Sequence, residues 1–435
     1  MTNLRKIVKK IVPNELFKKI EPAGHLTESV IMNIAYGFPA KKMHFIGVTG
    51  TNGKTTTTFL IYKMLHNAGF KVGFLSTVAY GCNGQFHDQI EHITTAQAGI
   101  LQSRLRDFSR AGVEWVVLES SSHSLAQYRT WGVDYEIAVM TNVTYEHLDY
   151  HGTFENYLQA KRRLFTITAK SKRGFGVVNA DDPNAKKFIE TTPRSVSYGI
   201  KGGELKASNI KLSTDHSTFT ACINKDEYSI RINIPGDFNV SNSLAAIAVG
   251  RELGLSRKQI EDGIASLEGV EGRMDSIREG QKFSVIIDFA GTPDAFERFF
   301  SSIKPSVKGK LISVFGSAGR RDEAKRSIQG EIAGKYCDEL VLTEEDDRDI
   351  DGNMILDQIA SGAKKVGKVK DKDMFLILDR ADAIKFSLSR AKSSNDVVVI
   401  LGKGHEKTIE RADGEHKWSD IDVTRKALRS LIKKS

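Results

Sequence analysis

The hydrophobic residues of this chain fall into short runs separated by polar and glycine-rich segments. The runs in its first part that are typical of buried strands lie at residues 43–48, 115–118, 136–141 and 176–179. After the first run, residues 55–67 carry leucine, isoleucine and methionine side chains at helical spacing. Strands that alternate with helices in this way predict a mostly parallel sheet.

A second series of strand-like runs follows a region at residues 200–235 that predicts short strands. These later runs lie at residues 283–289, 311–315, 339–343 and 397–401. We therefore predict an α/β protein with a phosphate-binding central domain and a C-terminal Rossmann-like domain. The predicted boundaries are a short basic N-terminal segment at residues 1–42, a central domain at 43–270 and a C-terminal domain at 271–435. Most of the strands run directly into polar segments, so we expect the chemistry at their carboxyl ends.

Size and composition narrow the class of protein. A chain of 435 residues is too long for one hydrophobic core, and 40% apolar with 27% charged residues is typical of globular proteins. No apolar stretch approaches the ~20 residues of a membrane span, and the lysine-rich N-terminus lacks the apolar run of a secretory signal. The three cysteines are far apart and suit a reducing compartment. We expect a cytoplasmic protein without membrane insertion.

The formal net charge of +9 is compatible with nucleic acid, a membrane surface or small anionic substrates as partners. The basic residues near both termini lack the interleaved aromatic side chains that stack on bases. We therefore interpret the charge as a solvated surface and expect no nucleic-acid partner.

A glycine-rich motif follows the first predicted strand and opens the first predicted helix. Residues 47–58 read GVTGTNGKTTTT, a variant of the pattern G-x-x-x-x-G-K-[ST] with Val48 at its first glycine position. In this context backbone N–H groups and the positive helix end face phosphate oxygens, Lys54 reaches the terminal phosphates, and the Thr55 hydroxyl can hold Mg²⁺. The alternative is an ordinary glycine-rich turn, but the lysine, threonine, strand and helix together favour a bound nucleotide.

Acidic and histidine side chains follow the next two strands. Residues 118–123 read LESSSH and residues 141–151 read TNVTYEHLDYH. A Glu119 carboxylate suits Mg²⁺ together with phosphate oxygens, whereas histidine is an unusual partner for this ion. By themselves, His147 and His151 are more typical of hydrogen-bonded structural histidines.

Several motifs in order give the chain a resemblance to a known family. They are the phosphate loop and the segments at residues 119–123, 142–152, 157–165, 179–182, 236–242, 272–274, 288–294, 316–322 and 402–406. Together they resemble the Mur ligases, and within them the muramyl-tripeptide synthetase branch, from residue 43 to about 430. The resemblance implies an ATP-dependent ligase that converts a carboxylate to an acyl phosphate and then joins it to an amine.

The resemblance also implies the substrates. They are a UDP-linked muramyl dipeptide, UDP-MurNAc-L-Ala-D-Glu, and a free diamino acid, either meso-diaminopimelate or L-lysine, joined during peptidoglycan precursor synthesis. ATP and Mg²⁺ are the implied cofactors, and we expect a monomer.

Nucleotide, metal and catalytic residues follow from the same resemblance. The expected nucleotide contacts are Gly50, Thr51, Asn52, Gly53, Lys54, Thr55, Thr56, Asn239, Asn242, Arg273 and Asp288. The expected metal contacts are Thr55, Glu119, His147 and Lys161, and the expected catalytic residues are Lys54, His147 and Lys161. The lysine that matches Lys161 is carbamylated by CO₂ in the family, which makes it an anion able to bind metal. Without the family, Lys161 would be interpreted as a helix-surface lysine one turn after Tyr157.

Substrate contacts are expected in both domains. For the muramyl substrate they are Thr94, Thr95, Ser121, Gln127 and Arg129, and for the amino acid they are Arg321, Arg348, Gly402 and Glu406. Arg129 has the strongest case from its chemistry alone, because guanidinium pairs well with carboxylate and phosphate oxygens.

The chain departs from the family pattern at several positions. Diaminopimelate-adding relatives carry D-N-P-R where residues 345–348 read EDDR. The retained arginine could pair a distal carboxylate, whereas the added acids favour a cationic side chain such as that of lysine or ornithine; the balance leans slightly to diaminopimelate. Ala96 replaces a proline, Glu146 an aspartate, and residues 289–292 read FAGT in place of YAHT.

The segment before the phosphate loop is short for the family. The 46 residues before Gly47 are fewer than a complete uridine-binding domain needs, so we expect a truncated region with one or two helices, at residues 15–19 and 29–36, or a different carrier.

Two other functions compete with the muramyl ligase. One is a related ligase of the folylpolyglutamate or cyanophycin type, against which the segments at residues 121–123 and 148–151 argue. The other is a nucleic-acid translocase or structural ATP-binding module, which explains the basic charge but leaves the motifs of the second domain unexplained.

Overall fold

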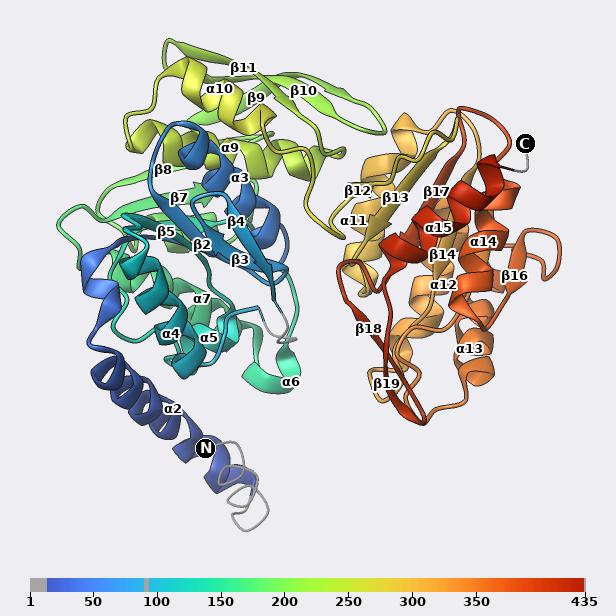
Figure 1. Ribbon diagram of the computed structural model, residues 1–435, viewed down its shortest axis with the longest axis horizontal. Coiled ribbons are helices and arrows are strands. Elements are labelled where there is room, and N and C mark those ends of the chain that lie inside the picture. The colour runs from blue at the N-terminus through green and yellow to red at the C-terminus, as the bar shows by residue number, and fades with distance from the viewer. Residues whose placement is uncertain (1–13, 90–93, 434–435) are drawn as a thin grey trace. The chain divides into compact units, whose positions relative to one another are not determined.

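The computed structural model describes residues 14–89 and 94–433, and the chain divides into two compact units. The first unit comprises residues up to 209 with 219–230 and 240–267, and the second comprises 210–218, 231–239 and 268 onward. The part of the predicted N-terminal segment before residue 14 lies outside the described residues. Each unit is an α/β structure (Figure 1), so the predicted fold class is confirmed.

An eleven-stranded sheet carries the phosphate loop. Its order is β11-β10-β9-β8-β7-β6-β1-β5-β2-β3-β4. The strands are β1 (His44–Thr49), β2 (Val72–Leu75), β3 (Ala79–Cys82), β4 (Gln85–Asp88), β5 (Trp115–Glu119), β6 (Tyr135–Met140), β7 (Phe175–Asn179), β8 (Ser195–Gly199), β9 (Leu205–Leu212), β10 (Ser217–Ile223) and β11 (Asp226–Ile232). β1 lies between β5 and β6 and is parallel to both, while β3 pairs antiparallel with β2 and β4. The central strands are buried almost throughout, as parallel strands covered on both faces are.

The helices of the first unit pack on this sheet or on one another. They are α2 (Asn14–Tyr36), α3 (Lys54–Asn67), α4 (Ala98–Arg110), α5 (Ser122–Ala126), α6 (Leu148–His151), α7 (Phe154–Thr168), α8 (Ala185–Ile189), α9 (Asp237–Glu252) and α10 (Arg257–Ala265), with a 3₁₀ turn, η1, at Pro39–Lys42. Apolar side chains of α4 and α7 pack with those of β1, β5, β6 and β7 in one core. From residue 14, where the described part of the chain begins, the N-terminal region forms the α-helix α2, which continues through Pro22 and packs on α4.

The second unit contains a six-stranded sheet of order β12-β13-β17-β14-β15-β16. The strands are β12 (Asp275–Ser276), β13 (Ser284–Asp288), β14 (Leu311–Phe315), β15 (Glu339–Leu342), β16 (Met374–Leu376) and β17 (Val397–Leu401), and a separate hairpin joins β18 (Thr408–Arg411) to β19 (Gly414–Lys417). All neighbouring strands of the sheet are parallel except β12 and β13. The mostly parallel order confirms the predicted Rossmann-like class.

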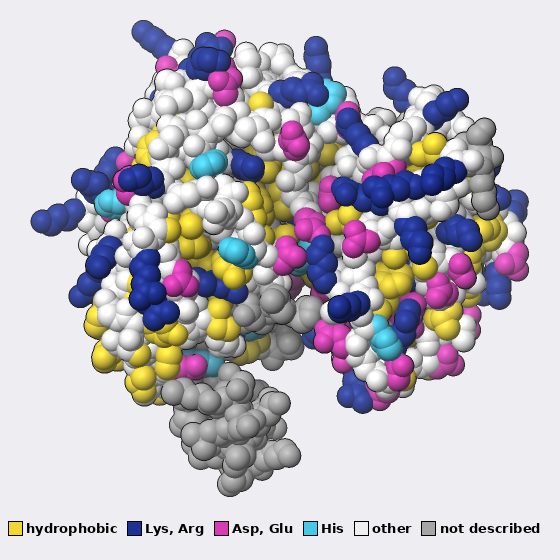
Figure 2. All heavy atoms as spheres, viewed as in Figure 1, with side chains coloured by type: hydrophobic (Ala, Val, Ile, Leu, Met, Phe, Trp, Pro, Cys, Tyr) yellow, Lys and Arg dark blue, Asp and Glu magenta, His cyan; other side chains and the backbone are white. Residues whose placement is uncertain are grey.

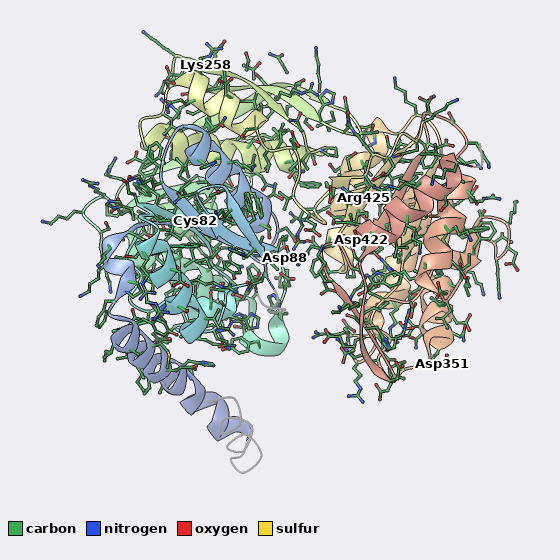
Figure 3. The ribbon with its side chains drawn as sticks, viewed as in Figure 1. Cys82, Asp88, Lys258, Asp351, Asp422 and Arg425 are labelled. Carbon is green, nitrogen blue, oxygen red and sulfur yellow. The ribbon has the colours of Figure 1, made fainter. Side chains whose placement is uncertain are left out.

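The helices of this unit are α11 (Pro293–Ile303), α12 (Ala324–Tyr336), α13 (Gly352–Lys365), α14 (Arg380–Arg390) and α15 (Asp420–Ile432), with a 3₁₀ turn, η2, at Lys304–Ser306. The α13 helix begins after Asp351, labelled in Figure 3, whose side chain accepts a hydrogen bond from the Asn353 N–H. A Cβ atom on Gly330 of α12 would overlap the Ile359 carbonyl of α13, so glycine is needed where these helices meet. A fully buried ion pair joins Arg380 to Asp420 at 2.7 Å.

Charged side chains are distributed over the face shown in Figure 2, where lysine and arginine alternate with acidic groups. This distribution agrees with a solvated basic surface. Among the described residues, no helix has the length and apolar character needed to cross a membrane.

Candidate active site

The phosphate loop joins β1 to α3, as the sequence predicts. Gly50 and Gly53 have φ of +153° and +85°, and a Cβ on either would overlap a neighbouring side chain, of Thr141 or Asn242 respectively. Only glycine permits this close approach without strain. The Lys54 ammonium donates to the Thr51 carbonyl at 2.8 Å and lies at the start of α3. The loop is therefore preformed around its lysine.

Two neighbouring segments hold the loop in place. The Thr51 N–H donates to the Asn142 carbonyl at 2.7 Å, and the Asn52 N–H donates to the Asn142 side chain at 3.0 Å. The Thr51 hydroxyl lies 2.9 Å from the Tyr157 hydroxyl on α7. The residues after β6 and the helix α7 thus fix the conformation of the phosphate loop. Tyr157 did not figure as a site residue in the sequence, where it served only to mark the position of Lys161.

Glu119 and Thr55 place oxygen donors side by side at the end of β5. The Thr55 hydroxyl lies 3.1 and 3.2 Å from the two carboxylate oxygens of Glu119, and Thr77 donates its N–H and hydroxyl to the same carboxylate at 2.9 and 3.0 Å. Hydroxyl and carboxylate oxygens are the ligands that Mg²⁺ prefers, usually with phosphate oxygens and water. The pair fits a Mg²⁺–nucleotide. Within the described ranges, no group of three or more His, Cys, Asp or Glu residues forms a metal site without such help.

Lys161 is buried in the interior of the first unit, with only 2% of its surface exposed. Its ammonium donates to the Gly50 carbonyl at 2.5 Å and lies 4.4 Å from the Tyr157 ring. Burial lowers the pKa of Lys161 well below its usual value, and the charge of Lys54 lowers it further, while Glu146 and Glu119 act in the opposite direction.

The interpretation of Lys161 as a surface lysine is therefore wrong. The other buried residues of α7 include Tyr157, Leu158, Leu164 and Phe165, so Lys161 stands in the middle of the apolar stripe. A lysine within the apolar stripe of a helix is unusual, so this position in the sequence could have indicated that Lys161 is buried.

Three histidines lie close together beside Lys161. The rings of His123 and His147 are 4.6 Å apart, and the His147 side chain lies 3.7 Å from the Glu146 carboxylate. The buried His151 lies 3.0 Å from the Ser122 hydroxyl, which is the arrangement of a structural histidine. Catalysis and metal binding by His147 remain predictions.

Three of the residues expected to hold the muramyl substrate, Thr95, Ser121 and Arg129, form a connected group. The Thr95 hydroxyl donates to the Glu119 carbonyl at 2.9 Å and accepts from the Ser121 N–H at 3.1 Å, and Arg129 donates to the Thr95 carbonyl at 2.9 Å. Gln127 is buried, and its side-chain carbonyl has no hydrogen-bond partner within the described part of the chain. These contacts preform a polar surface next to Glu119, a candidate metal ligand.

One cavity brings the predicted groups together. It has a volume of about 240 Å³, and its lining comprises Gly50, Lys54, Thr94, Ser121, Ser122, His123, Arg129, Glu146, His147, Tyr157 and Lys161. The lining thus combines phosphate-loop, metal-binding and substrate-binding candidates. A larger cavity of about 520 Å³ includes Cys82 of β3 (Figure 3) and contains none of the predicted site residues.

The candidate nucleotide contacts outside the loop fall in both units. Asn242 accepts a hydrogen bond from the Thr57 hydroxyl at 3.3 Å and so contacts α3, while Asn239 donates to the Pro235 carbonyl at 2.7 Å. In the second unit, the Arg273 guanidinium lies 4.6 Å from the Phe289 ring.

Asp288 lies in the same part of the second unit. Its carboxylate accepts the N–H groups of Met274 and Ala290, both at 2.8 Å. Burial raises the pKa of Asp288, against the opposing effect of Arg273. The roles of Arg273 and Asp288 toward a nucleotide remain predictions.

The candidate amino-acid site lies in the second unit at the ends of β15 and β17. Arg348 donates to the Glu410 carboxylate at 2.7 Å and to the Gly319 carbonyl at 2.5 Å. Glu406 pairs with the buried Lys403 at 2.5 Å. Arg321 is exposed, and Gly402 has φ of +108°. The sequence did not point to Lys403 or Glu410 as partners of these residues.

Comparison with known proteins supports the same family for both parts of the chain. Residues 48–250 match the model of the Mur ligase middle domain, and residues 272–404 match that of the Mur ligase glutamate ligase domain. UDP-N-acetylmuramyl-tripeptide synthetase of Roseiflexus sp. (strain RS-1) is 39% identical over 410 residues, which are 91% of this chain and 80% of that protein. This chain belongs to the Mur ligase family. Members of this family are ATP-dependent amide ligases.

Other relatives of this Mur ligase agree with that assignment. UDP-N-acetylmuramoyl-L-alanyl-D-glutamate–2,6-diaminopimelate ligase 1 of Clostridium acetobutylicum is 36% identical over 430 residues, covering 98% of this chain and 86% of the relative. A solved structure of a 2,6-diaminopimelate ligase of the same kind has a TM-score of 0.67 and 30% identity, covering 95% of this chain and 83% of the other. A folylpolyglutamate synthase of Mycobacterium tuberculosis has a TM-score of 0.70 at 16% identity, covering 94% and 96% of the two chains, and shares the fold.

Proposed function

We propose that this Mur ligase joins a diamino acid to the D-Glu carboxylate of UDP-MurNAc-L-Ala-D-Glu at the expense of ATP. The observation that carries the proposal is the single cavity in which Lys54, Lys161 and Arg129 meet. The names of the similar synthetases and diaminopimelate ligases support the substrates. The cytoplasm, where nucleotide-linked precursors are made, is the proposed compartment, and a monomer the proposed state.

The first step activates the substrate carboxylate. Arg129, Thr94 and Ser121 would hold the muramyl peptide, while Lys54 and the N–H groups of the loop would hold the terminal phosphates of ATP. A carboxylate oxygen attacks the γ-phosphorus, the bond to the bridging oxygen breaks, and ADP leaves. The Lys54 ammonium would lower the repulsion between the substrate carboxylate and the γ-phosphate, and would stabilise the charge of the transferring phosphoryl group.

The second step forms the amide. The neutral amine of the amino acid attacks the acyl carbon, phosphate leaves, and the nitrogen loses a proton. Thr55 and Glu119 would hold Mg²⁺, which supplies further neutralisation of phosphate charge when bound. Water near the acyl phosphate would hydrolyse it and consume ATP without forming an amide, so exclusion of water from the cavity would favour amide formation.

Lys161 is proposed to act as a carbamate. Carbamate formation requires a neutral amine, which attacks the carbon of CO₂ and then loses a proton. Burial and the charge of Lys54 both favour that neutral form. The product is an anion beside Lys54, so it would relieve the repulsion between two ammonium groups and offer oxygen ligands to a metal ion. A cationic Lys161 could do neither.

The amino acid is proposed to bind in the second unit through Arg321, Arg348, Gly402 and Glu406. In the family pattern these positions contact the carboxylates and the far end of the amino acid. Asn239, Asn242 and Arg273 are proposed to contact the adenosine part of ATP, and Asp288 to orient Arg273 or the ribose. Residues 43–270 and 271–435 are proposed as the two catalytic domains.

The decisive experiment measures ADP release with purified protein, ATP and Mg²⁺ across acid and amine pairs. We expect release only when the muramyl dipeptide and a diamino acid are both present. The Lys161→Ala variant should be inactive and partly restored by small carboxylates, while Lys172→Ala, at an exposed lysine beyond α7, should behave like wild type. Turnover with a folate substrate but not with the muramyl dipeptide would contradict the proposal, and Lys161→Ala with full activity would contradict the role of the carbamate.

A further inference from the structure

The one arginine in the EDDR segment is already occupied by a carboxylate of the same chain. Arg348 follows β15 and has φ of +57°, and its backbone N–H donates to the Glu410 carbonyl at 3.0 Å. Its guanidinium donates to the Glu410 carboxylate at 2.7 Å and to the Gly319 carbonyl at 2.5 Å. Three hydrogen bonds therefore fix Arg348 against β18 and the loop after β14. A second carboxylate, brought by a substrate, would have to compete with Glu410.

The buried Lys403 ammonium pairs with two carboxylates, one more than its charge neutralises. Lys403 has 1% of its surface exposed, and its ammonium lies 2.7 Å from Asp346 and 2.5 Å from Glu406. Although burial opposes its charge, Glu406 and Asp346 raise the pKa of Lys403. Two carboxylates on one ammonium leave one negative charge beside the residue expected to contact the amino acid, Glu406.

A further carboxylate faces Gly402. Glu345 has 8% of its surface exposed, and one of its oxygens has no hydrogen-bond partner within the described part of the chain. A Cβ atom at Gly402 would lie 2.5 Å from that oxygen, so the absence of a side chain at Gly402 leaves room beside it. Buried carboxylate oxygens are stabilised by hydrogen-bond donors, and an ammonium group supplies three.

We propose that Glu410 acts as a specificity residue, which neutralises Arg348 and so selects an amino acid whose side chain ends in an ammonium group without a second carboxylate. The substrate class is that of lysine and ornithine, and diaminopimelate is disfavoured. This inference rests on the proposed function, in which the second unit binds the amino acid. It also reverses the slight lean to diaminopimelate that the sequence gives.

The balance of charge around the site is the physical reason for the expected preference for lysine over diaminopimelate. The ammonium end of lysine meets the excess carboxylates around Lys403 and Glu345. The distal carboxylate of diaminopimelate meets the same negative groups, and the Arg348 guanidinium is already paired with Glu410. A half-exposed ion pair contributes up to about 1 kcal/mol, so we expect up to about a fivefold preference for lysine over diaminopimelate in kcat/KM.

The experiment compares kcat/KM for L-lysine and meso-diaminopimelate in wild type and variants. Glu410→Gln keeps the shape of the side chain but removes its charge, and should raise the diaminopimelate-to-lysine ratio up to about fivefold. Adding Arg348→Ala to Glu410→Gln should abolish this gain, because the gain needs a guanidinium freed for the substrate. Asp349→Asn is the matched control, since Asp349 pairs with Arg320 on a similarly exposed surface, and it should leave the ratio unchanged.

Each outcome bears on the inference. A wild-type preference for diaminopimelate, or a ratio unchanged in both Glu410→Gln and Glu410→Ala, overturns it while leaving the ligase function intact. An equal gain in Asp349→Asn also overturns it, because the effect would then be one of general surface charge. If wild-type protein forms no amide with either amino acid, the proposed function itself fails, and the inference fails with it.

Discussion

Replacing Asp347 by asparagine should stabilise the second unit at neutral and alkaline pH. Burial raises the pKa of Asp347 to about 6 from its ordinary 3.8; the N–H of Glu345 opposes the rise, and the carboxylates of Glu344, Glu345 and Asp346 add to it. The side chain accepts the Glu345 N–H at 3.3 Å, and an asparagine carbonyl can accept it equally well. The substitution therefore removes a charge and keeps the hydrogen bond.

The magnitude follows from linkage between protonation and folding. The rise from 3.8 to about 6 corresponds to an upper limit of about 3 kcal/mol, at about 1.4 kcal/mol for each tenfold change in proton affinity. Because the folded state binds the proton more tightly, this carboxyl favours folding most at low pH, and that contribution is lost as pH rises from about 4 to about 6. Ion pairs of Asp346 with Lys403 and of Glu344 with Arg411 screen part of the repulsion. We expect a gain of about 1–2 kcal/mol for Asp347→Asn at pH 8, and almost none at pH 4.

Urea unfolding measured at a series of pH values tests this expectation. The fluorescence of Trp418 reports the second unit when Trp115 and Trp131, which lie in the first, are replaced by phenylalanine in every protein compared. The difference between variant and parent at each pH cancels the titration of other groups. Asp357→Asn, at an exposed position on α13, is the control and should show no such pH-dependent gain. A gain independent of pH, or a loss at pH 8, would refute the reasoning.

Three further predictions concern the cavity and the second unit. Lys54→Ala should abolish amide formation in the ADP-release assay while Lys63→Ala on the same helix retains it; near-normal turnover of Lys54→Ala would contradict the phosphate-loop assignment. Asp420→Ala leaves the buried Arg380 without its carboxylate and should cost about 3–5 kcal/mol of stability by urea unfolding, so a loss below about 1 kcal/mol would show that the pair is not needed. Burial raises the pKa of the Cys337 thiol, so it should resist iodoacetamide in native protein at pH 8 and react after unfolding in urea; labelling of the native thiol would contradict its burial.

The sequence predicts the long central strands well and the sheet edges poorly. The apolar runs at residues 115–118 and 397–401 became strands because parallel neighbours bury both their faces. The edge strand β4 and its neighbour β3 are only four residues long, and β4 is exposed throughout, so neither carries a long apolar run. The helix α2 continues through Pro22, a residue that normally ends or kinks a helix.

The residues of the candidate site likewise divide into those that the sequence predicts and those that it does not. Residues predicted to contact a phosphate through the backbone, such as Gly50 and Gly53, are recognisable because the loop needs their conformation. Residues that act through another side chain, such as Thr77 on Glu119, carry no signal, since a threonine after a short strand is typical of any turn. Glu410 was beyond prediction for another reason, because its pairing with Arg348 depends on how a distant hairpin folds back.

The hydroxyl contact between Thr51 and Tyr157 has a consequence for engineering. The helix that carries Tyr157 also carries Lys161. A phosphate loop transplanted into another scaffold without this helix would therefore lack both the contact that holds Thr51 and the buried lysine. Chimeras cut between residues 51 and 157 would need matching halves, and shuffled libraries should yield active recombinants mainly when both segments descend from one parent.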